Sequence, residues 1–347
     1  MQNKDGLTVD ADHVVAITNG GGIRAAIKPG DVTKKDINTV LPFGNTVAVI
    51  YVTGAELLEA LEASTYSLPV GGFPQVAGIN FTLSTAVAYD ANAETYPAST
   101  YYGPKSINRV VINSINGKEF KANEVYAVVT NNFCAAGGDT YYAFKAASAQ
   151  FDTGIPLDEA VMEYVTTELK GVIGAQYAAP QGRILMNPFK DVKVSSWFGK
   201  YVIDLYNDGV INGTSATTYA PNDTLTWAAA LKLLLVSNGD LKAADATGAD
   251  WSKNTIAKAA ELGLVAADLD GAKAISRLEF CQVAAKLNKL AESKTESKFT
   301  DCTDGYVMAL VDAKVINGMT ETTFEPAASL TRAQIAKIIY QLNLIER

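Results

Sequence analysis

Three short segments of this sequence combine glycines with side chains that can bind a small ligand. They are Asn19-Gly20-Gly21-Gly22-Ile23-Arg24, Leu41-Pro42-Phe43-Gly44-Asn45, and Asn132-Phe133-Cys134-Ala135-Ala136-Gly137-Gly138-Asp139. Two aromatic rings can hold a flat heterocycle by stacking, a carboxylate can accept hydrogen bonds from a diol, and an arginine pairs with anions. The segments therefore predict a pocket for a planar, anionic ligand.

The glycine run that follows the apolar residues 14–17 has more than one interpretation. Glycine lets a backbone approach a ligand closely, because it has no Cβ. The spacing Gly20-x-Gly22-x-x-Ala25 also fits a dinucleotide-binding turn, but that motif needs a helix at its last glycine, and Pro29-Gly30 argue against one. No Gly-Lys-Ser/Thr follows, which excludes a Walker phosphate loop. An ordinary glycine-rich turn beside a surface arginine remains an alternative.

Spacing alone also leaves alternatives for the other candidates. Phe43 and Phe133 each precede glycine-rich backbone and can project into a cleft, although core packing is the commoner outcome for such rings. Asp139 follows two glycines and could cap its own loop instead of meeting a ligand.

The elements expected to position these residues form a sheet with helices packed on it. Residues 12–18, 46–52 and 126–130 are rich in apolar and β-branched residues, which predicts strands. Thr53 and Glu56 form a capping box that predicts the start of a helix. Further expectations are short strands and long loops over 63–105, a hairpin within 107–120, helical spacing over 156–169, and a closing segment at 182–185.

The order and spacing of the three segments resemble those of the C-terminal, nucleotide-specificity domain of bacterial and animal 5'-nucleotidases. Gly30-Asp31-Val32-Thr33 and Gln75-Val76-Ala77-Gly78-Ile79 lie between the segments and strengthen the resemblance, which covers about residues 9–187. It implies an α+β domain with a mixed sheet, in which Phe43 and Phe133 clamp the base of a nucleotide.

The same resemblance implies roles for the remaining candidates. Asn19 and Asn45 would meet the edge of the base, Asp139 would accept hydrogen bonds from the ribose, and Arg24 would lie near the phosphate. Close backbone contacts would come from Gly21 and Gly78.

Catalysis in that family takes place in a separate N-terminal metallophosphoesterase domain, which binds two divalent metals through Asp, His and Asn. The sequence has one histidine, His13, which is interpreted as a strand-edge residue and cannot supply such a cluster. We therefore expect no metal or cofactor in this chain, and binding as its activity. The resemblance also implies a further arginine upstream of the first strand, which this sequence does not include.

Length and charge restrict the classes of protein that remain. With 347 residues, two or three domains are expected. The net charge of −8 disfavours a nucleic acid polymer as partner, whereas a single nucleotide needs only one or two placed arginines. No apolar run reaches the roughly 18 residues of a membrane span. Three cysteines make no disulfide framework; Cys281 and Cys302 could pair, but buried free thiols are the favoured interpretation.

After residue 187 the sequence repeats itself. The motif at 210–213 (Val-Ile-Asn-Gly) returns at 315–318, and 225–228 (Leu-Thr-Trp-Ala) returns as Leu-Thr-Arg-Ala at 330–333, with a middle copy around 275–279. Each copy is interpreted as helix, loop, helix, with capping boxes at Ser276/Glu279 and Thr331/Gln334. The sequence thus predicts domains at 1–187 and 188–347, the second with repeats of about 188–240, 241–293 and 294–347.

These repeats resemble S-layer homology domains, whose signature is Ile/Leu-Thr-Arg-Ala-Glu. The resemblance implies an all-α pseudo-threefold bundle that binds anionic secondary cell-wall polysaccharide through the signature arginines. Arg277 and Arg332 match those arginines, whereas Trp227 replaces the arginine of the first copy and is expected to weaken that groove. The alternative for both arginines is a solvated position at a helix N-terminus.

Together the two resemblances imply the substrate-binding half of a 5'-nucleotidase-type phosphoester hydrolase, exported and anchored at the cell wall or S-layer. Its expected partners are a nucleotide or nucleoside, cell-wall polysaccharide and a separate metallophosphoesterase domain. The competing hypothesis is a non-catalytic structural or adhesive cell-surface protein whose first domain has lost nucleotide recognition.

Overall fold

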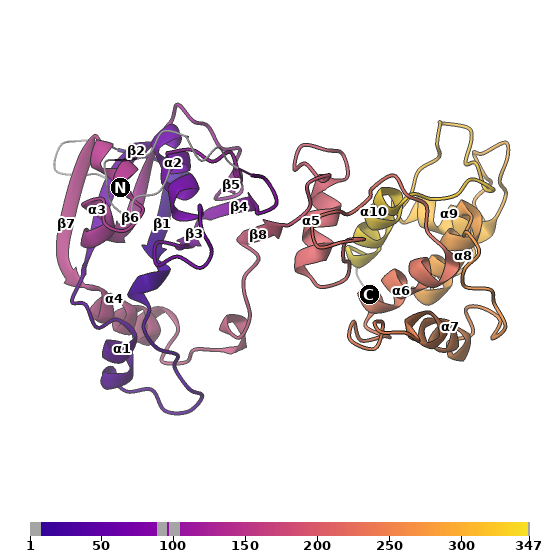
Figure 1. Ribbon diagram of the computed structural model, residues 1–347, viewed down its shortest axis with the longest axis horizontal. Coiled ribbons are helices and arrows are strands. Elements are labelled where there is room, and N and C mark those ends of the chain that lie inside the picture. Colours follow the sequence, from indigo (N-terminus) through magenta and orange to yellow (C-terminus); the bar gives the residue numbers. More distant parts are fainter. Residues whose placement is uncertain (1–7, 89–95, 97–104, 346–347) are drawn as a thin grey trace. The chain divides into compact units, whose positions relative to one another are not determined.

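The computed structural model describes residues 8–88, 96 and 105–345, and it divides into two compact units, Met1–Met186 and Asn187–Arg347 (Figure 1). We call them unit 1 and unit 2. Part of the region 63–105, where short strands were expected, lies outside the described residues.

Unit 1 is built on a five-stranded sheet, which is mixed as expected. Its strands are β1 (Val14–Asn19), β2 (Thr46–Thr53), β3 (Pro74–Ala77), β6 (Val125–Asn131) and β7 (Ala149–Pro156), in the order β3-β1-β6-β2-β7. β1 runs parallel to β6, and the other neighbours are antiparallel. Because β1 and β6 are parallel, their C-terminal ends lie at the same edge of the sheet.

A smaller sheet has the order β5-β4-β8. Its strands are β4 (Ile79–Ser84), β5 (Val110–Ile115) and β8 (Ile184–Asn187). Helix α2 (Gly54–Ser64) contacts strands of both sheets, and its Leu57 and Leu61 are fully buried in one hydrophobic core with residues of each. The hairpin expected within 107–120 is reduced to a single bridge between Ile115 and Lys118.

The helix starts in unit 1 follow from their caps. The expected capping box of α2 is present, with Glu56 accepting a 2.7 Å hydrogen bond from the backbone of Thr53. α1 (Lys34–Val40) begins at a second box made by Thr33 and Asp36. α3 (Asn132–Ala135) is one short turn, and α4 (Leu157–Glu163) continues as a wider turn to Glu168.

The start of unit 1 differs from one expectation and agrees with another. The strand expected from residue 12 begins at Val14, because Ala11–His13 form a turn of 3-10 helix. Gly20–Gly22 form another such turn, and no helix follows it until Lys34. The dinucleotide-binding interpretation is therefore excluded, as the Pro29-Gly30 pair predicted.

Beyond the end of β8, the regular elements of unit 2 in its described residues are helices, which are joined by loops and isolated β-bridges. Its helices are α5 (Gly199–Asn207), α6 (Trp227–Asn238), α7 (Trp251–Glu261), α8 (Arg277–Leu287), α9 (Gly305–Asp312) and α10 (Arg332–Asn343). The capping boxes expected at the starts of α8 and α10 are both present. Within the described ranges, no helix of either unit has the length and hydropathy to span a membrane.

The starts of α6, α8 and α10 are joined in a closed cycle. The backbone N–H of Trp227 donates to Lys273, that of Arg277 to Ala328, and that of Arg332 to Asp223, at 2.9, 2.8 and 2.9 Å. The first copy thus bonds to the second, the second to the third, and the third back to the first. One helical pair cannot bury its apolar face alone, so this cycle explains why the copies fold together.

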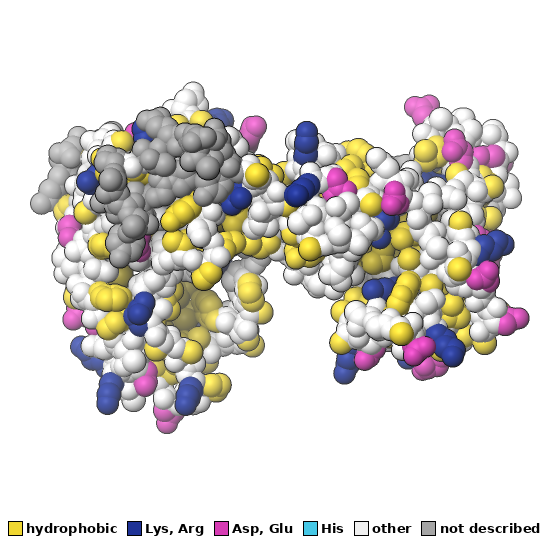
Figure 2. Space-filling view, viewed as in Figure 1, with side chains coloured by type: hydrophobic (Ala, Val, Ile, Leu, Met, Phe, Trp, Pro, Cys, Tyr) yellow, Lys and Arg dark blue, Asp and Glu magenta, His cyan; other side chains and the backbone are white. Residues whose placement is uncertain are grey.

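On the face shown in Figure 2, Lys and Arg side chains are interspersed with Asp and Glu over both units. Neither sign forms a continuous patch there. A protein that binds nucleic acid polymers usually carries a basic patch. This face shows no continuous basic patch.

Candidate functional site

The three segments that were expected to bind a ligand meet at one edge of the five-stranded sheet. β2 and β6 are antiparallel, with Val47 opposite Asn131, and the backbone N–H of Thr46 donates to the Asn132 side chain at 3.3 Å. Phe43 lies three residues before Thr46, and Phe133 follows Asn132 directly. The two rings therefore leave the sheet from adjacent ends of paired strands.

Both rings are exposed, which excludes the core-packing alternative. The exposed fraction is 61% for Phe43 and 44% for Phe133, although both are large apolar residues. Phe133 rests on backbone, because a Cβ added to Gly138 would lie only 2.5 Å from its ring. The guanidinium of Arg24 lies over the Phe43 ring, 5.9 Å from the ring centroid.

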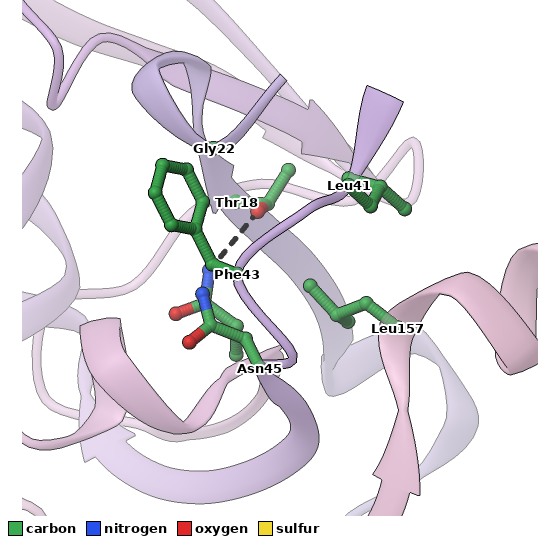
Figure 3. Close-up of a pocket in the computed structure, with 7 residues that line it drawn as sticks. Thr18, Gly22, Leu41, Phe43, Asn45 and Leu157 are labelled. Carbon is green, nitrogen blue, oxygen red and sulfur yellow. Dashed lines mark hydrogen bonds between the residues drawn. The ribbon is translucent and has the colours of Figure 1, made fainter. Parts of the chain in front are cut away.

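A shallow pocket opens beside Phe43. Its enclosed volume is only about 10 Å³, and it is lined by Thr18, Gly22, Leu41, Phe43, Asn45, Asn131 and Leu157. Figure 3 shows the Phe43 ring and the Asn45 amide at the turn that enters β2, with Leu41 and Leu157 away from the ring. This volume lies below the roughly 300–1,000 Å³ of sites that enclose a whole ligand. The pocket suits part of a ligand.

Asn45 presents its side chain to this pocket. Its backbone carbonyl accepts a 2.9 Å hydrogen bond from Leu157, which fixes the turn. In the part of the chain that the structure describes, no hydrogen bond engages the Asn45 amide. An amide offers both a donor and an acceptor, so Asn45 can meet a polar ring edge.

Asp139 and Asn19 are held together at the same edge. The Asn19 amide nitrogen donates to the Asp139 carboxylate at 2.6 Å, and the Asn19 amide oxygen accepts from Asn131 at 3.0 Å. Asn19 is only 5% exposed. The Asn19 side chain is thus placed to hold Asp139 and not to contact the ligand itself. Asp139 is half-buried at the rim of the site.

The glycine run makes close approaches, but two of its three glycines face protein. The N–H of Gly20 donates to Phe73 and that of Gly21 to Gly71, at 2.8 and 2.7 Å. A Cβ on Gly21 would lie 2.9 Å from the Gly71 carbonyl oxygen. Gly21 therefore accommodates the chain at 71–73, and only Gly22 of this run lines the pocket.

Gly78 is not brought together with the other expected ligand-binding residues. Ala77 pairs with Ala16 near the start of β1, whereas Asn19 ends that strand, so Gly78 lies toward the opposite edge of the sheet. Its φ of +76° requires glycine, and the Asn116 side chain occupies the space where a Cβ would lie. Gly78 forms the turn between β3 and β4.

Arg24 is exposed at the mouth of the site. Its backbone N–H donates to Val40 at 2.9 Å, and its side chain donates to the Gly21 carbonyl at 3.2 Å. These bonds place the guanidinium beside Phe43, where it is accessible to an anion.

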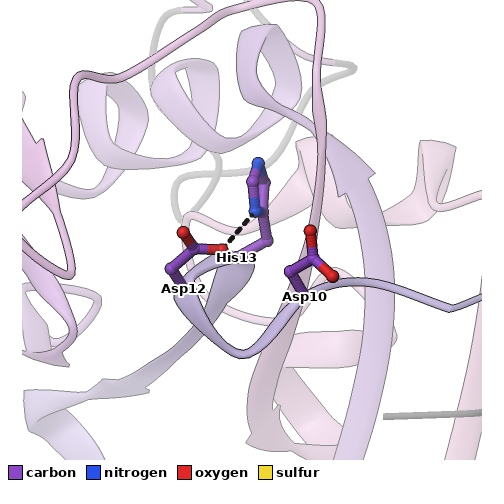
Figure 4. Close-up of side chains that lie close together, drawn as sticks. All are labelled: Asp10, Asp12 and His13. Carbon is purple, nitrogen blue, oxygen red and sulfur yellow. Dashed lines mark hydrogen bonds and ion pairs between the residues drawn. The ribbon is translucent and has the colours of Figure 1, made fainter.

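His13 forms an ion pair more readily than a metal site. Asp10, Asp12 and His13 lie close enough to share an ion (Figure 4), but both ring nitrogens of His13 already face carboxylates, Asp12 at 2.9 Å and Glu124 at 2.7 Å. The Glu124 hydrogen bond raises the pKa of His13. A protonated imidazole has no lone pair to offer a metal.

The three cysteines are free and buried, so the Cys281–Cys302 disulfide is not formed. Burial raises the pKa of the Cys134 and Cys281 thiols to about 12. Such thiols are poor nucleophiles at neutral pH, and Cys134 is part of the framework of the site.

The two signature arginines of unit 2 make contacts within the chain. Arg277 is 7% exposed, donates to the Asn317 carbonyl at 2.7 Å, and lies 4.6 Å from the centroid of the Phe324 ring. The alternative of a solvated arginine is wrong for Arg277. Its guanidinium joins the middle copy to the last one.

Arg332 repeats this arrangement between the last copy and the first. It donates to the carbonyls of Tyr219 and Asn212 at 2.7 and 2.9 Å, and its guanidinium lies 4.5 Å from the Tyr219 ring centroid. Arg332 is less buried than Arg277. Trp227 occupies the corresponding helix start in the first copy and is also buried.

Comparison with known families agrees with both resemblances. Residues 4–146 match the family model described as 5'-nucleotidase, C-terminal domain, and residues 188–230 and 301–336 match the S-layer homology domain. The chain carries a 5'-nucleotidase C-terminal domain followed by S-layer homology domains. The middle copy expected at 241–293 lies between the two matched segments.

Individual relatives match about half of the chain. A trifunctional nucleotide phosphoesterase protein of Bacillus subtilis is 38% identical over 188 residues, which are 52% of this chain and 12% of that protein. A 5'-nucleotidase of Vibrio cholerae is 30% identical over 49% of this chain and 27% of its own length. A cell wall protein of Listeria monocytogenes is 31% identical over 43% of this chain and 17% of its own. The chain thus spans a minor part of these relatives.

Proposed function

We propose that unit 1 is the substrate-binding half of a 5'-nucleotidase-type phosphoester hydrolase and that it holds the base of a nucleotide between Phe43 and Phe133. One observation carries this proposal: two exposed phenylalanines leave the adjacent ends of β2 and β6, beside a pocket that admits part of a ligand. Exposed aromatic rings offer flat faces on which a base can stack.

The remaining groups match the parts of a nucleotide. Asn45 would meet the base edge, and the Asp139 carboxylate would accept hydrogen bonds from the ribose hydroxyls. Arg24 would approach the phosphate, with its position over Phe43 set by the bond to Val40. The base would lie against the shallow pocket, and the sugar and phosphate would extend outward from it.

Hydrolysis needs chemistry that unit 1 does not provide. We place it in a separate metallophosphoesterase domain with two divalent metals, which would activate water and neutralise the leaving phosphate. In this proposal unit 1 presents the phosphate of a bound nucleotide to those metals.

Unit 2 would attach the protein to the cell wall outside the cell. We propose three S-layer homology repeats around a pseudo-threefold axis, which the hydrogen-bond cycle between α6, α8 and α10 supports. Arg332 is the better candidate for contact with an anionic wall polysaccharide, because its Nη1 has no partner among the described residues. Arg277 would act indirectly, by holding its repeat junction.

Calorimetric titration of the whole chain with adenosine and AMP tests nucleotide binding. Base stacking is worth roughly 1–3 kcal/mol per aromatic face, so Phe133→Ala should weaken binding by about 5- to 150-fold. Phe151→Ala, at another exposed phenylalanine on β7, is the control and should bind as wild type does. Absent or equal heats for wild type and Phe133→Ala would favour the alternative, a non-catalytic wall protein.

Sedimentation with purified cell-wall polysaccharide tests the attachment. The whole chain should sediment with the polymer, and Arg332→Gln should reduce the bound fraction while leaving α10 folded. Wild-type binding by this variant would remove Arg332 from the contact.

A further inference from the structure

We propose that Asn131 is a positioning residue that fixes the Asp139 carboxylate and the Phe133 ring relative to each other. This inference rests on the nucleoside-binding function proposed above. Asn131 ends β6 and is 1% exposed, and it lines the floor of the pocket beside Phe43.

Every polar group of the Asn131 side chain is used. Its amide oxygen accepts from the backbone N–H of Cys134 at 2.8 Å, and its amide nitrogen donates to Asn19 at 3.0 Å and to Thr18 at 3.1 Å. These bonds fix which way the amide points, because an exchange of its oxygen and nitrogen would break the bonds to Cys134 and Asn19.

The orientation of Asn131 sets that of Asn19. Since Asn19 accepts from Asn131 with its oxygen, its nitrogen faces Asp139 and donates to one carboxylate oxygen at 2.6 Å. A reversed Asn19 would place its oxygen against the carboxylate and repel it. One oxygen of Asp139 is thus held, and the other remains for a diol.

Asp139 needs this support because of its backbone. Its φ is +49°, a left-handed conformation that is uncommon for residues with a side chain. The bond from Asn19 connects Asp139 to the sheet across 120 positions of sequence. Without it, the loop after Gly138 would place the carboxylate less uniformly.

The same Asn131 side chain also fixes the helix that carries Phe133. Asn131 is the N-cap of α3, and its bond to Cys134 satisfies a backbone donor of that single turn. One buried amide therefore couples the stacking ring to the diol acceptor. A change at Asn131 should therefore alter the affinity for a ligand that contacts both groups differently from the affinity for a ligand that contacts only the ring.

Calorimetry of the whole chain with adenosine and with 2',3'-dideoxyadenosine separates the two contacts. The dideoxy compound keeps the base and lacks the diol. In the wild type, hydrogen bonds to a charged acceptor should make adenosine bind about 10-fold more tightly or better. Asp139→Ala should bring the ratio of the two Kd values close to one.

Two variants test Asn131. Asn131→Asp keeps the acceptor for Cys134 but turns an oxygen toward Asn19, and Asn131→Ser keeps a helix cap that is too short to reach Asn19. Both should reduce the ratio to below about threefold, while the dideoxy compound binds within about threefold of wild type. Asn113→Asp and Asn113→Ser are matched controls at an exposed asparagine of β5, outside the site, and they should keep the wild-type ratio.

The outcomes are distinguishable. A wild-type ratio in the folded Asn131 variants would overturn the proposal and leave nucleoside binding intact, and so would equal affinity of the wild type for both compounds. If the wild type binds neither compound, the proposed function fails, and the role of Asn131 fails with it. Circular dichroism identifies any variant that does not fold, in which case the other Asn131 variant decides.

Discussion

The side chain of Asn19 donates a 2.6 Å hydrogen bond to Asp139, a residue 120 positions away. Asn19 ends β1, and Asp139 lies in the loop after α3, so this bond joins the first and third ligand-binding segments. Asn19→Leu should lower the free energy of unfolding by about 1–3 kcal/mol, because it removes one of the three partners of the Asn131 amide and the side-chain partner of Asp139. Urea denaturation measures this, and an unchanged midpoint and slope would show that the bond contributes little.

A methyl group at Gly138 should disturb the stacking ring. The added Cβ would lie 2.5 Å from Phe133, so the ring must move. We expect Gly138→Ala to weaken adenosine binding by about 10-fold or more. Gly71→Ala is the control, because the nearest atom to its Cβ would lie 3.9 Å away. Equal affinities for the two variants would argue against a role for the Phe133 position.

The ion pair of His13 predicts a pH dependence of stability. The pKa of His13 is raised from 6.5, mainly by its hydrogen bond to Glu124, so the folded state holds its proton more tightly than the unfolded state. The stabilisation is fully present below pH 6.5 and is lost as pH rises through the folded-state pKa. Denaturation of wild type and His13→Gln between about pH 5.5 and 8.5 should show a difference that shrinks with pH. A difference that grows with pH would contradict the ion pair.

Arg277 should matter for the stability of unit 2. Its loss removes a charged hydrogen bond to Asn317 and the contact with the Phe324 ring. Arg277→Ala should therefore cost about 2–4 kcal/mol of unfolding free energy. Lys286→Ala, at an exposed position of the same helix, loses only a contact with the Tyr306 ring and should change it by less than about 1 kcal/mol. Similar denaturation curves for both variants would show that Arg277 contributes no more to stability than an exposed residue does.

The chain by itself should not hydrolyse nucleotides. Its one histidine has both nitrogens in hydrogen bonds to carboxylates, and the described residues of unit 1 show no ligand set of the kind that a two-metal hydrolase uses. An assay of phosphate release from AMP with Mn²⁺ should show no turnover above buffer. Metal-dependent turnover by the purified chain would reveal a catalytic site that this account lacks.

Local sequence signals predicted much of the framework. The capping boxes at Thr53, Ser276 and Thr331 form as expected, because they depend on residues three positions apart. The box at Thr33 and Asp36 carried the same kind of signal for α1, with aspartate in place of glutamate, and it was overlooked.

Contacts between segments far apart in the sequence could not be predicted from it. Gly21 was expected to face a ligand, but its neighbour is Gly71, which no spacing rule connects to it. Arg277 was expected to face a polymer, but its ring partner lies in the next repeat. Asn131 was missed because a polar residue at the end of a strand signals only a helix cap until its partners, Asn19 and Thr18, are known.

A crystal structure of the whole chain with adenosine tests the central claim most directly. We expect the adenine ring between Phe43 and Phe133, at about 3.5–4.0 Å from each ring plane, with Asn45 at its edge. Adenine bound elsewhere, or in contact with neither ring, would contradict the account.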